Sequence, residues 1–303
     1  MKILITGANG LLGQKLVRKL AENESVKTIA TGRGKVRITK IPTNATYVQC
    51  DISKPEEVAA VFTFHNPDVV IHAAAMTNVD ECELNPSACR IQNVDATANV
   101  VKACEQINAH LIHLSTDFIF DGKDGPYSEN GVPNPISIYG QSKLDAEYIV
   151  QKATCSWAIA RTVLVYGISP GLSRTNIILW VKSSLEQGKQ IQVVDDQFRT
   201  PTLAEDLAKG CILIAEKKAT GIFNISGKEL LTPYQMALKT AAYFKLDENL
   251  IVRASATTFT QPAKRPPRTG FDISKAEQIL EYIPHSFEQG IQILERQMLE
   301  MSK

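Results

Sequence analysis

The chain has 303 residues, 44% of them hydrophobic, and a formal net charge of +1. This length allows one large domain or two moderate ones with a substantial core. A charge so close to zero gives no reason to expect nucleic acid or an anionic membrane as a partner, and no apolar run approaches the roughly 20 residues that span a bilayer.

The N-terminus and the cysteines indicate a cytoplasmic protein. The first apolar run begins at residue 3, with no secretory leader before it. The six cysteines form no Cys-x-x-Cys pair and have no histidines at metal-binding spacing. We therefore expect reduced thiols and no metal site.

The first thirteen residues, Met1-Lys-Ile-Leu-Ile-Thr-Gly-Ala-Asn-Gly-Leu-Leu-Gly13, predict a strand, a glycine turn and a helix. Gly7 permits a tight turn, Gly10 lets the backbone approach phosphates, and Gly13 lets the helix pack closely on the strand. The helix N-terminus directs free N–H groups at the anion. Because the glycines follow a strand and precede a helix, they predict a dinucleotide-binding turn.

Strand and helix patterns alternate through the first half of the chain, which predicts a Rossmann-type, doubly wound parallel α/β sheet. The later strands are near-continuous apolar runs, as expected when both sheet faces are covered. The expected strands are residues 3–6, 26–31, 46–50, 69–73, 111–115 and 157–162, and the expected helices are residues 12–22, 55–65, 86–107 and 138–152.

The regular alternation of strand and helix patterns ends after residue 162, where prolines separate shorter elements. We expect a dinucleotide-binding domain over residues 1–165 and a smaller C-terminal α/β substrate domain over residues 166–303. Some segments of the second part, such as residues 203–217, are expected to pack back on the first.

The end of the second strand bears on the choice of nicotinamide cofactor. An acidic residue about 20 positions past the glycines would hold a ribose 2′-hydroxyl, but Thr31-Gly32-Arg33-Gly34-Lys35 has no carboxylate. Arg33, with Lys35 or Arg37 nearby, could pair with a 2′-phosphate. This favours NADPH over NADH; the alternative is a solvated basic loop.

Tyr139 and Lys143 stand four residues apart at the start of a predicted helix, so their side chains share a face. An ammonium beside a phenol lowers the tyrosine pKa, and such a tyrosine can protonate a carbonyl oxygen as hydride reaches its carbon. Tyr148 and Lys152 repeat the spacing, but Tyr148 lies deeper in the helix and is interpreted as a packing residue.

Ser115-Thr116-Asp117 ends the fifth predicted strand, at the sheet edge where ligands bind in such folds. A hydroxyl there can hydrogen-bond a substrate carbonyl. The alternative is a hydroxyl that caps a loop.

The glycine turn together with Tyr139-x-x-x-Lys143 resembles the extended short-chain dehydrogenase/reductases. The resemblance is most specific to the dTDP-4-dehydrorhamnose reductases, runs over nearly the whole chain, and includes a late segment similar to their Arg-Pro-x-Asn-Ser-x-Leu-Asp. The matching motifs are His72-Ala-Ala-Ala-Met-Thr-Asn-Val-Asp80, Ser115-Thr-Asp-Phe-Ile-Phe-Asp-Gly122, Tyr139-Gly-Gln-Ser-Lys143, Arg199-Thr-Pro-Thr202 and Arg265-Pro-Pro-Arg-Thr-Gly-Phe-Asp272.

The resemblance implies NADPH-dependent reduction of a 4-keto-6-deoxy sugar nucleotide, dTDP-4-dehydrorhamnose to dTDP-rhamnose. It also implies a homodimer in which each subunit contributes two helices, those expected at residues 86–107 and 138–152. Some relatives use Mg²⁺, for which the sequence offers no ligand cluster. The implied catalytic set is Thr116, Tyr139 and Lys143. The expected cofactor-binding residues are Gly7, Gly10, Leu11, Leu12, Gly13, Arg33, Asp51, Ile52, Ala73, Ala74, Ala75, Thr77, Tyr139 and Lys143, and the expected substrate-binding residues are Thr77, Val79, Thr116, Asp117, Leu164 and Arg265.

Two departures concern the sugar and the base. Leu164 stands where the family often has tryptophan, and Arg268-Thr269 replaces Asn-Ser in the late motif. Two other functions stay open. A sugar-nucleotide epimerase of the same fold would recycle its hydride, and a binding or regulatory subunit would keep the fold without turnover. Dehydration is disfavoured because Phe118 replaces the glutamate that dehydratases carry there.

Overall fold

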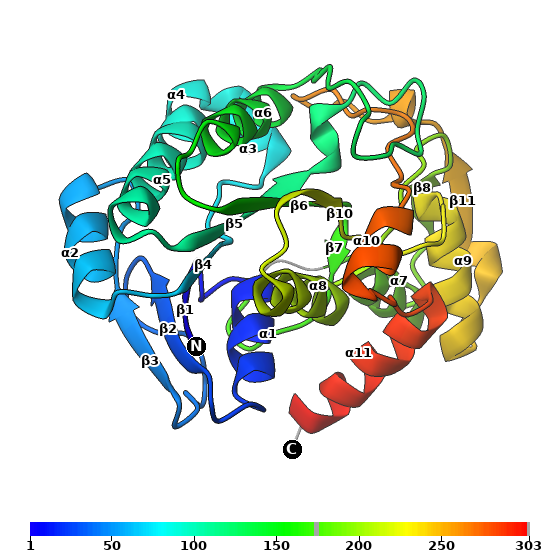
Figure 1. Cartoon of the computed structure of the whole chain (residues 1–303). Coiled ribbons are helices and arrows are strands. Elements are labelled where there is room, and N and C mark those ends of the chain that lie inside the picture. Colours follow the sequence, from blue (N-terminus) through cyan, green and yellow to red (C-terminus); the bar gives the residue numbers. More distant parts are fainter. Residues whose placement is uncertain (173–175, 302–303) are drawn as a thin grey trace.

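A seven-stranded parallel sheet forms the centre of the computed structural model, which describes residues 1–172 and 176–301 (Figure 1). The strand order is β10-β6-β5-β4-β1-β2-β3, so the winding reverses between β1 and β4. This confirms the predicted Rossmann-type, doubly wound α/β class. The strands are β1 (Lys2–Thr6), β2 (Lys27–Gly32), β3 (Ala45–Gln49), β4 (Val69–His72), β5 (His110–Thr116), β6 (Trp157–Thr162) and β10 (Gly221–Asn224).

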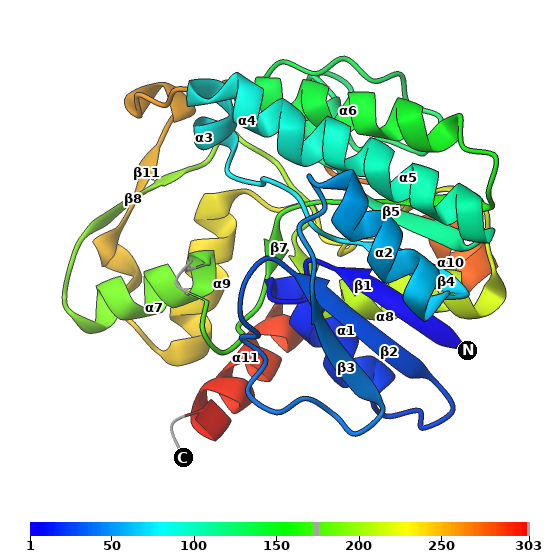
Figure 2. The same cartoon turned by 90° about the vertical axis from the view of Figure 1, so that its left-hand side faces the viewer.

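Helices cover both faces of the sheet (Figures 1 and 2). One face carries α1 (Leu11–Leu20) and α8 (Ala204–Lys217), and the other carries α2 (Pro55–His65), α5 (Ala96–Ile107) and α6 (Ile138–Gln151). The side chains of β5 alternate between the two layers: Ile112 joins the core under α1 and α8, and Leu111 joins the core under α2 and α5. Central strands buried on both faces need apolar residues at nearly every position, which is why they were recognisable in the sequence.

Elements before residue 163 lie close to their predicted bounds, and each strand end differs from its prediction by at most one residue. The helix predicted over residues 86–107 is continuous, with a π-helical turn (Ile91–Asp95) between α4 (Pro86–Arg90) and α5. Among the elements around the central sheet, the short helix α3 (Val79–Leu84) and the edge strand β10 were not predicted. Only six and four residues long, they offer too little periodicity to detect.

The remaining C-terminal elements form two smaller hydrophobic cores, one around Tyr166 and Phe287 and one around Val181 and Ala241. By contrast α8, β10 and α10 (Ser274–Leu280) belong to the central layers, and the division at residue 165 stays a prediction. The further strands are β7 (Val165–Tyr166), β8 (Ile191–Val194), β9 (Thr202–Leu203) and β11 (Ile251–Ala254); the further helices are α7 (Ile177–Glu186), α9 (Pro233–Phe244), α10 (Ser274–Leu280) and α11 (Phe287–Met301), with 3₁₀ turns at Asp117–Ile119, Glu248–Leu250 and Ala256–Thr258.

Candidate active site

In the turn between β1 and α1, the positions of Gly7 and Gly13 leave no room for a side chain. Gly7 has a φ of +71°, and a Cβ there would lie 2.8 Å from the backbone of Ala74. A Cβ on Gly13 would lie 2.4 Å from the carbonyl oxygen of Gly7. Gly10 caps α1 without a side-chain hydrogen bond, so the first-turn amides of α1 are available to an anion. These features fit a dinucleotide pyrophosphate.

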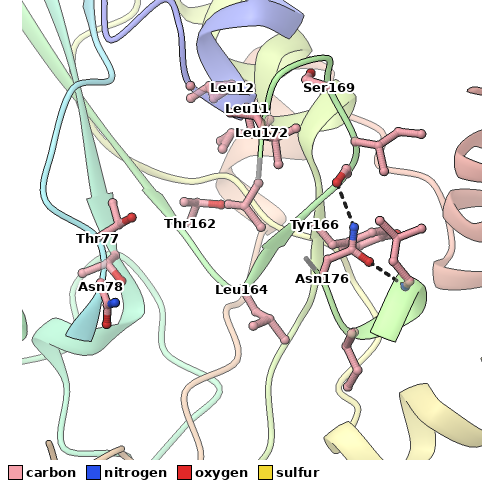
Figure 3. Close-up of a pocket in the computed structure, with 18 of the residues that line it drawn as sticks. Leu11, Leu12, Thr77, Asn78, Thr162, Leu164, Tyr166, Ser169, Leu172 and Asn176 are labelled. Atoms are coloured by element: carbon pink, nitrogen blue, oxygen red, sulfur yellow. Dashed lines mark hydrogen bonds between the residues drawn. The ribbon is translucent and has the colours of Figure 1, made fainter. Parts of the chain in front are cut away.

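A cavity of about 1450 Å³ extends from this turn along the carboxyl edge of the sheet (Figure 3). Of the predicted cofactor residues, Ala74, Arg33, Asp51 and Ile52 are outside its lining. The predicted site residues that line it are Gly7, Gly10, Leu11, Leu12, Gly13, Ala73, Ala75, Thr77, Val79, Thr116, Asp117, Tyr139, Lys143, Leu164 and Arg265.

Tyr139 reaches this cavity from the first turn of α6. The Ser137 hydroxyl caps the helix by accepting a hydrogen bond from the amide of Gly140 at 3.2 Å. A Cβ on Gly140 would lie 2.2 Å from the carbonyl oxygen of Phe118, so glycine allows the helix to begin against the end of β5. The Tyr139 ring is 8% exposed and meets the Phe118 ring edge-on.

Lys143 lies one turn further along α6 and is buried. Its Nζ donates a hydrogen bond to the carbonyl oxygen of Leu114 at 2.6 Å and lies 3.2 Å from Nε2 of His113. Burial lowers the pKa of Lys143 to about 8, although the negative charge of Glu147 opposes this shift. The second Tyr-x-x-x-Lys pair lies elsewhere: Tyr148 is 48% exposed, so its interpretation as a packing residue was wrong.

Thr116 ends β5 and Asp117 follows it, and both residues line the cavity. The Thr116 hydroxyl donates a hydrogen bond to Asp117 Oδ1 at 3.1 Å and accepts one from the amide of Phe118 at 3.3 Å. Thus it also caps the short turn that begins at Asp117, which was the alternative reading of this motif. Burial raises the pKa of Asp117, against the opposing positive charge of Arg199.

The sequence did not reveal how the late motif contributes to this site. The Thr269 hydroxyl donates a hydrogen bond to Asp117 Oδ2, and Arg199 Nε lies 3.7 Å from the same oxygen. The Arg199 guanidinium also donates to the carbonyl oxygen of Pro266 at 2.6 Å. The Arg-Thr-Pro-Thr segment therefore connects Asp117 with the late motif, which lies about 70 residues further along the chain than Arg199.

Arg265 lines the cavity while its guanidinium is engaged by a carboxylate. Its two Nη atoms donate to Asp80 at 3.1 and 2.7 Å, and this hydrogen bonding lowers the pKa of Asp80. Any substrate contact by Arg265 would therefore compete with Asp80.

Leu164, 43% exposed, also borders the cavity, and its φ of +36° is unusual for a residue with a side chain.

Arg33 lies in a second, smaller cavity of about 740 Å³, which shares Ala75, Thr77 and Asn78 with the main one. Its charge also reaches Asp51. Burial would raise the pKa of Asp51, but hydrogen bonds from Ser53 and the Arg33 charge bring it below its usual value. Arg33 therefore lies beside the main cavity and is not part of its wall.

Sequence analysis did not identify several residues between β7 and α7 that line the cavity: Gly167, Ile168, Ser169, Leu172 and Asn176. Figure 3 shows Tyr166, Ser169, Leu172 and Asn176 around it. Asn176 donates to the carbonyl oxygen of Gly167 at 2.8 Å and caps α7 by accepting from the amide of Leu179 at 3.1 Å. An asparagine before an apolar run is a helix-start signal that could have located α7.

Within residues 1–172 and 176–301, no group of three or more His, Cys, Asp or Glu side chains is arranged to hold a metal ion. None of the helices in the same ranges is long and apolar enough to cross a membrane. The six cysteines are free thiols, and all are buried.

The doubly wound sheet, the glycine turn and the shared cavity of Tyr139 and Lys143 define an NAD(P)-dependent oxidoreductase of the extended short-chain dehydrogenase/reductase type. The chain belongs to the family described as "RmlD substrate binding domain", whose model matches residues 1–299. This confirms the family resemblance found in the sequence.

Two curated relatives and two solved structures bear on function. The chain is 32% identical to the probable low-salt glycan biosynthesis reductase Agl14 of Haloferax volcanii, covering 91% of each chain. It is 31% identical to methionine adenosyltransferase 2 subunit beta of Mus musculus, covering 91% of this chain and 81% of the relative. A dTDP-4-dehydrorhamnose reductase of Clostridium acetobutylicum superposes with a TM-score of 0.87 at 28% identity, over 99% of this chain and 100% of the other. The Bacillus anthracis dTDP-4-dehydrorhamnose reductase in complex with NADP superposes with a TM-score of 0.85 at 26% identity, over 98% and 99%.

Proposed function

We propose that this protein reduces the C4 keto group of a 4-keto-6-deoxy sugar nucleotide, with NADPH as reductant and dTDP-4-dehydrorhamnose as the first substrate to test. The observation that carries the proposal is that Thr116, Tyr139 and Lys143 line one cavity with the glycine turn. The names of the solved structures similar to this chain support the same reaction class.

A bound nicotinamide supplies the hydride in this class of reaction. Tyr139 is the proposed general acid, donating its phenolic proton to the developing alkoxide oxygen. The buried Lys143 ammonium stabilises the phenolate that remains. The Thr116 hydroxyl, on releasing Asp117 Oδ1, donates a hydrogen bond to the same substrate oxygen. The residues that would hold the cofactor are the glycine turn with Leu11 and Leu12, and the Ala73 to Ala75 segment with Thr77.

The preference for NADPH rests on Arg33. No carboxylate comes directly after β2 in the sequence. The exposed Arg33 guanidinium lies at the edge of the cavity, where it is available to a 2′-phosphate. Asp51 and Ile52 are proposed to border the adenine. The complex of the Bacillus anthracis reductase with NADP supports this choice, with NADH as the alternative.

The substrate is proposed to lie between the late motif and the loop after β4. Thr77, Val79 and Asp117 would meet the sugar, and Leu164 would contact its apolar face, since all four line the cavity. Arg265 would bind the diphosphate after releasing Asp80.

The test is a kinetic assay with the purified protein, following oxidation of NADPH with dTDP-4-dehydrorhamnose and with UDP- and GDP-linked 4-keto sugars. We expect stoichiometric NADPH oxidation and a reduced sugar product. Interconversion of sugar epimers without consumption of NADPH would instead establish the epimerase alternative.

A regulatory subunit is the second candidate, because a relative of 31% identity is named as the beta subunit of methionine adenosyltransferase 2. Under this alternative, no sugar nucleotide would be reduced, and the protein would bind a partner enzyme and alter its kinetics. Titration calorimetry and assays with a methionine adenosyltransferase catalytic subunit would distinguish the two.

The homodimer and the cytoplasmic location are likewise proposals. The expected dimer helices, residues 86–107 and α6, lie side by side on one face of the sheet (Figure 2). Light scattering during size-exclusion chromatography measures the oligomeric state directly.

A further inference from the structure

His113 occupies a central position in β5, beneath α6, the helix that carries Tyr139 and Lys143. It lies on the same face of the strand as Leu111, which packs in the core under α2 and α5. The register pairs His113 with His72 of β4, and His72 with Thr6 of β1. Three polar side chains thus form a row across the covered face of the sheet.

Of the two histidines in this row, His113 is the one in contact with Lys143. His113 Nε2 lies 3.2 Å from Lys143 Nζ. The two nitrogens of His72 instead lie 2.7 Å from the Thr6 hydroxyl and 3.1 Å from the Thr97 hydroxyl. The two imidazole rings are neighbours, with centroids 5.2 Å apart. His72 is therefore a matched reference for a buried imidazole in the same layer.

The contact defines which nitrogen of His113 carries a proton. Burial, assisted by the Lys143 charge, holds the pKa of His113 well below its usual value, so the ring is neutral. An ammonium can only donate hydrogen bonds, and therefore Nε2 accepts and Nδ1 bears the hydrogen. In the part of the chain that the structure describes, Nδ1 is buried without a partner. An unsatisfied buried donor is destabilising, so packing alone does not explain an imidazole here.

We propose that His113 is a positioning residue of the active site, whose Nε2 holds the Lys143 ammonium at the cavity wall. The proposal rests on the reaction proposed above. An ammonium has three N–H donors, and within the described residues Leu114 and His113 accept from two of them. The third N–H donor then has a fixed direction, toward ligand groups bound beside Tyr139.

Removing the acceptor has a predictable effect on the protonation of Lys143. A hydrogen bond accepted from the charged amine stabilises that form, so its loss lets Lys143 deprotonate at lower pH. The basic limb of the kcat profile should then move to lower pH. The other titratable or charged groups around Lys143 come from four elements: Glu147 and Tyr139 of α6, His72 of β4, Cys89 of α4, and Arg161 of β6, which pairs with Glu147.

Three variants separate positioning from packing. His113→Leu removes the acceptor at similar volume, His113→Gln places an amide oxygen near the position of Nε2, and His72→Gln removes the neighbouring imidazole. For His113→Leu we expect kcat to fall about tenfold or more, the size of one hydrogen bond to a charged group, with the KM for the sugar nucleotide within about twofold. Its basic limb should move to lower pH, whereas His113→Gln and His72→Gln should keep the wild-type limb.

The positioning role is rejected if His113→Leu keeps the basic limb of the kcat–pH profile at its wild-type pH and keeps kcat within about twofold of the wild-type value. It is equally rejected if His113→Gln is as impaired as His113→Leu, because the acceptor would then not be the relevant property.

A measurement on the unliganded wild-type protein needs neither turnover nor a folded variant. Nitrogen-15 NMR of labelled histidine distinguishes the two neutral tautomers from the imidazolium. We expect the Nδ1–H tautomer for His113 near neutral pH, and an Nε2–H tautomer or an imidazolium overturns the inference. If the wild-type protein reduces no 4-keto sugar, the proposed function fails, and the tautomer still decides whether His113 holds Lys143.

Discussion

The burial of Lys143 makes the stability of this protein depend on pH in a way that one substitution can isolate. The ammonium is 3% exposed, and its pKa is lowered from 10.5 in water to about 8. Because the folded state has the lower pKa, the unfolded chain binds more protons between these two values. Stability must therefore rise with pH in this window. Below about pH 8, the folded state bears the full cost of a buried charge.

The magnitude follows from linkage. At pH 7 the shift costs roughly 3 kcal/mol of folding free energy, and at pH 9.5 roughly 1.4 kcal/mol, a difference of about 2 kcal/mol. Lys143→Met removes this titration. The hydrogen bond to Leu114 is lost at every pH in the variant, so it cancels from the change with pH.

Urea denaturation of the wild-type protein and Lys143→Met from about pH 7 to about pH 9.5 measures this difference. We expect the free energy of unfolding of the wild-type protein to gain about 2 kcal/mol relative to the variant as the pH rises. Lys152→Met, at the exposed end of the same helix, is the control and should track the wild-type protein. A wild-type minus Lys143→Met difference that stays flat with pH would refute the reasoning.

Three further predictions concern the site and its support. Tyr139→Phe should lower kcat by about 10² to 10⁴ while cofactor affinity stays near the wild-type value, and Tyr148→Phe should keep activity; steady-state kinetics and cofactor titration check both, and an unchanged kcat for Tyr139→Phe would reject its role as acid. Arg33→Ala should raise the KM for NADPH more than that for NADH, and an equal loss would remove the 2′-phosphate argument. Glu147→Gln should lower the free energy of unfolding by about 3–5 kcal/mol, because it leaves the buried Arg161 guanidinium, now bonded at 2.7 and 3.0 Å, without its counter-charge; a loss below about 1 kcal/mol in urea denaturation contradicts this.

The sequence by itself determined most of the central sheet, the glycine turn and the spacing of Tyr139 and Lys143 along the chain. These features are local: a strand buried on both faces must be apolar throughout, and a turn with Gly7 at positive φ and Gly13 against Gly7 excludes side chains. Tyr139 and Lys143 could be singled out because their spacing and their place after a loop are visible within a few residues.

Only the tertiary structure decided what surrounds those residues. It joined β10 to the sheet, placed Thr269 and Arg199 on Asp117, and paired Arg265 with Asp80. It also brought His113 to Lys143, and exposed Tyr148 where packing was expected. Each of these results depends on how segments far apart in the sequence pack in space, and hydrophobic periodicity does not predict such long-range packing. The pKa of a buried amine depends on these distant neighbours, so the spacing of Tyr139 and Lys143 was visible in the sequence and the electrostatics around Lys143 were not.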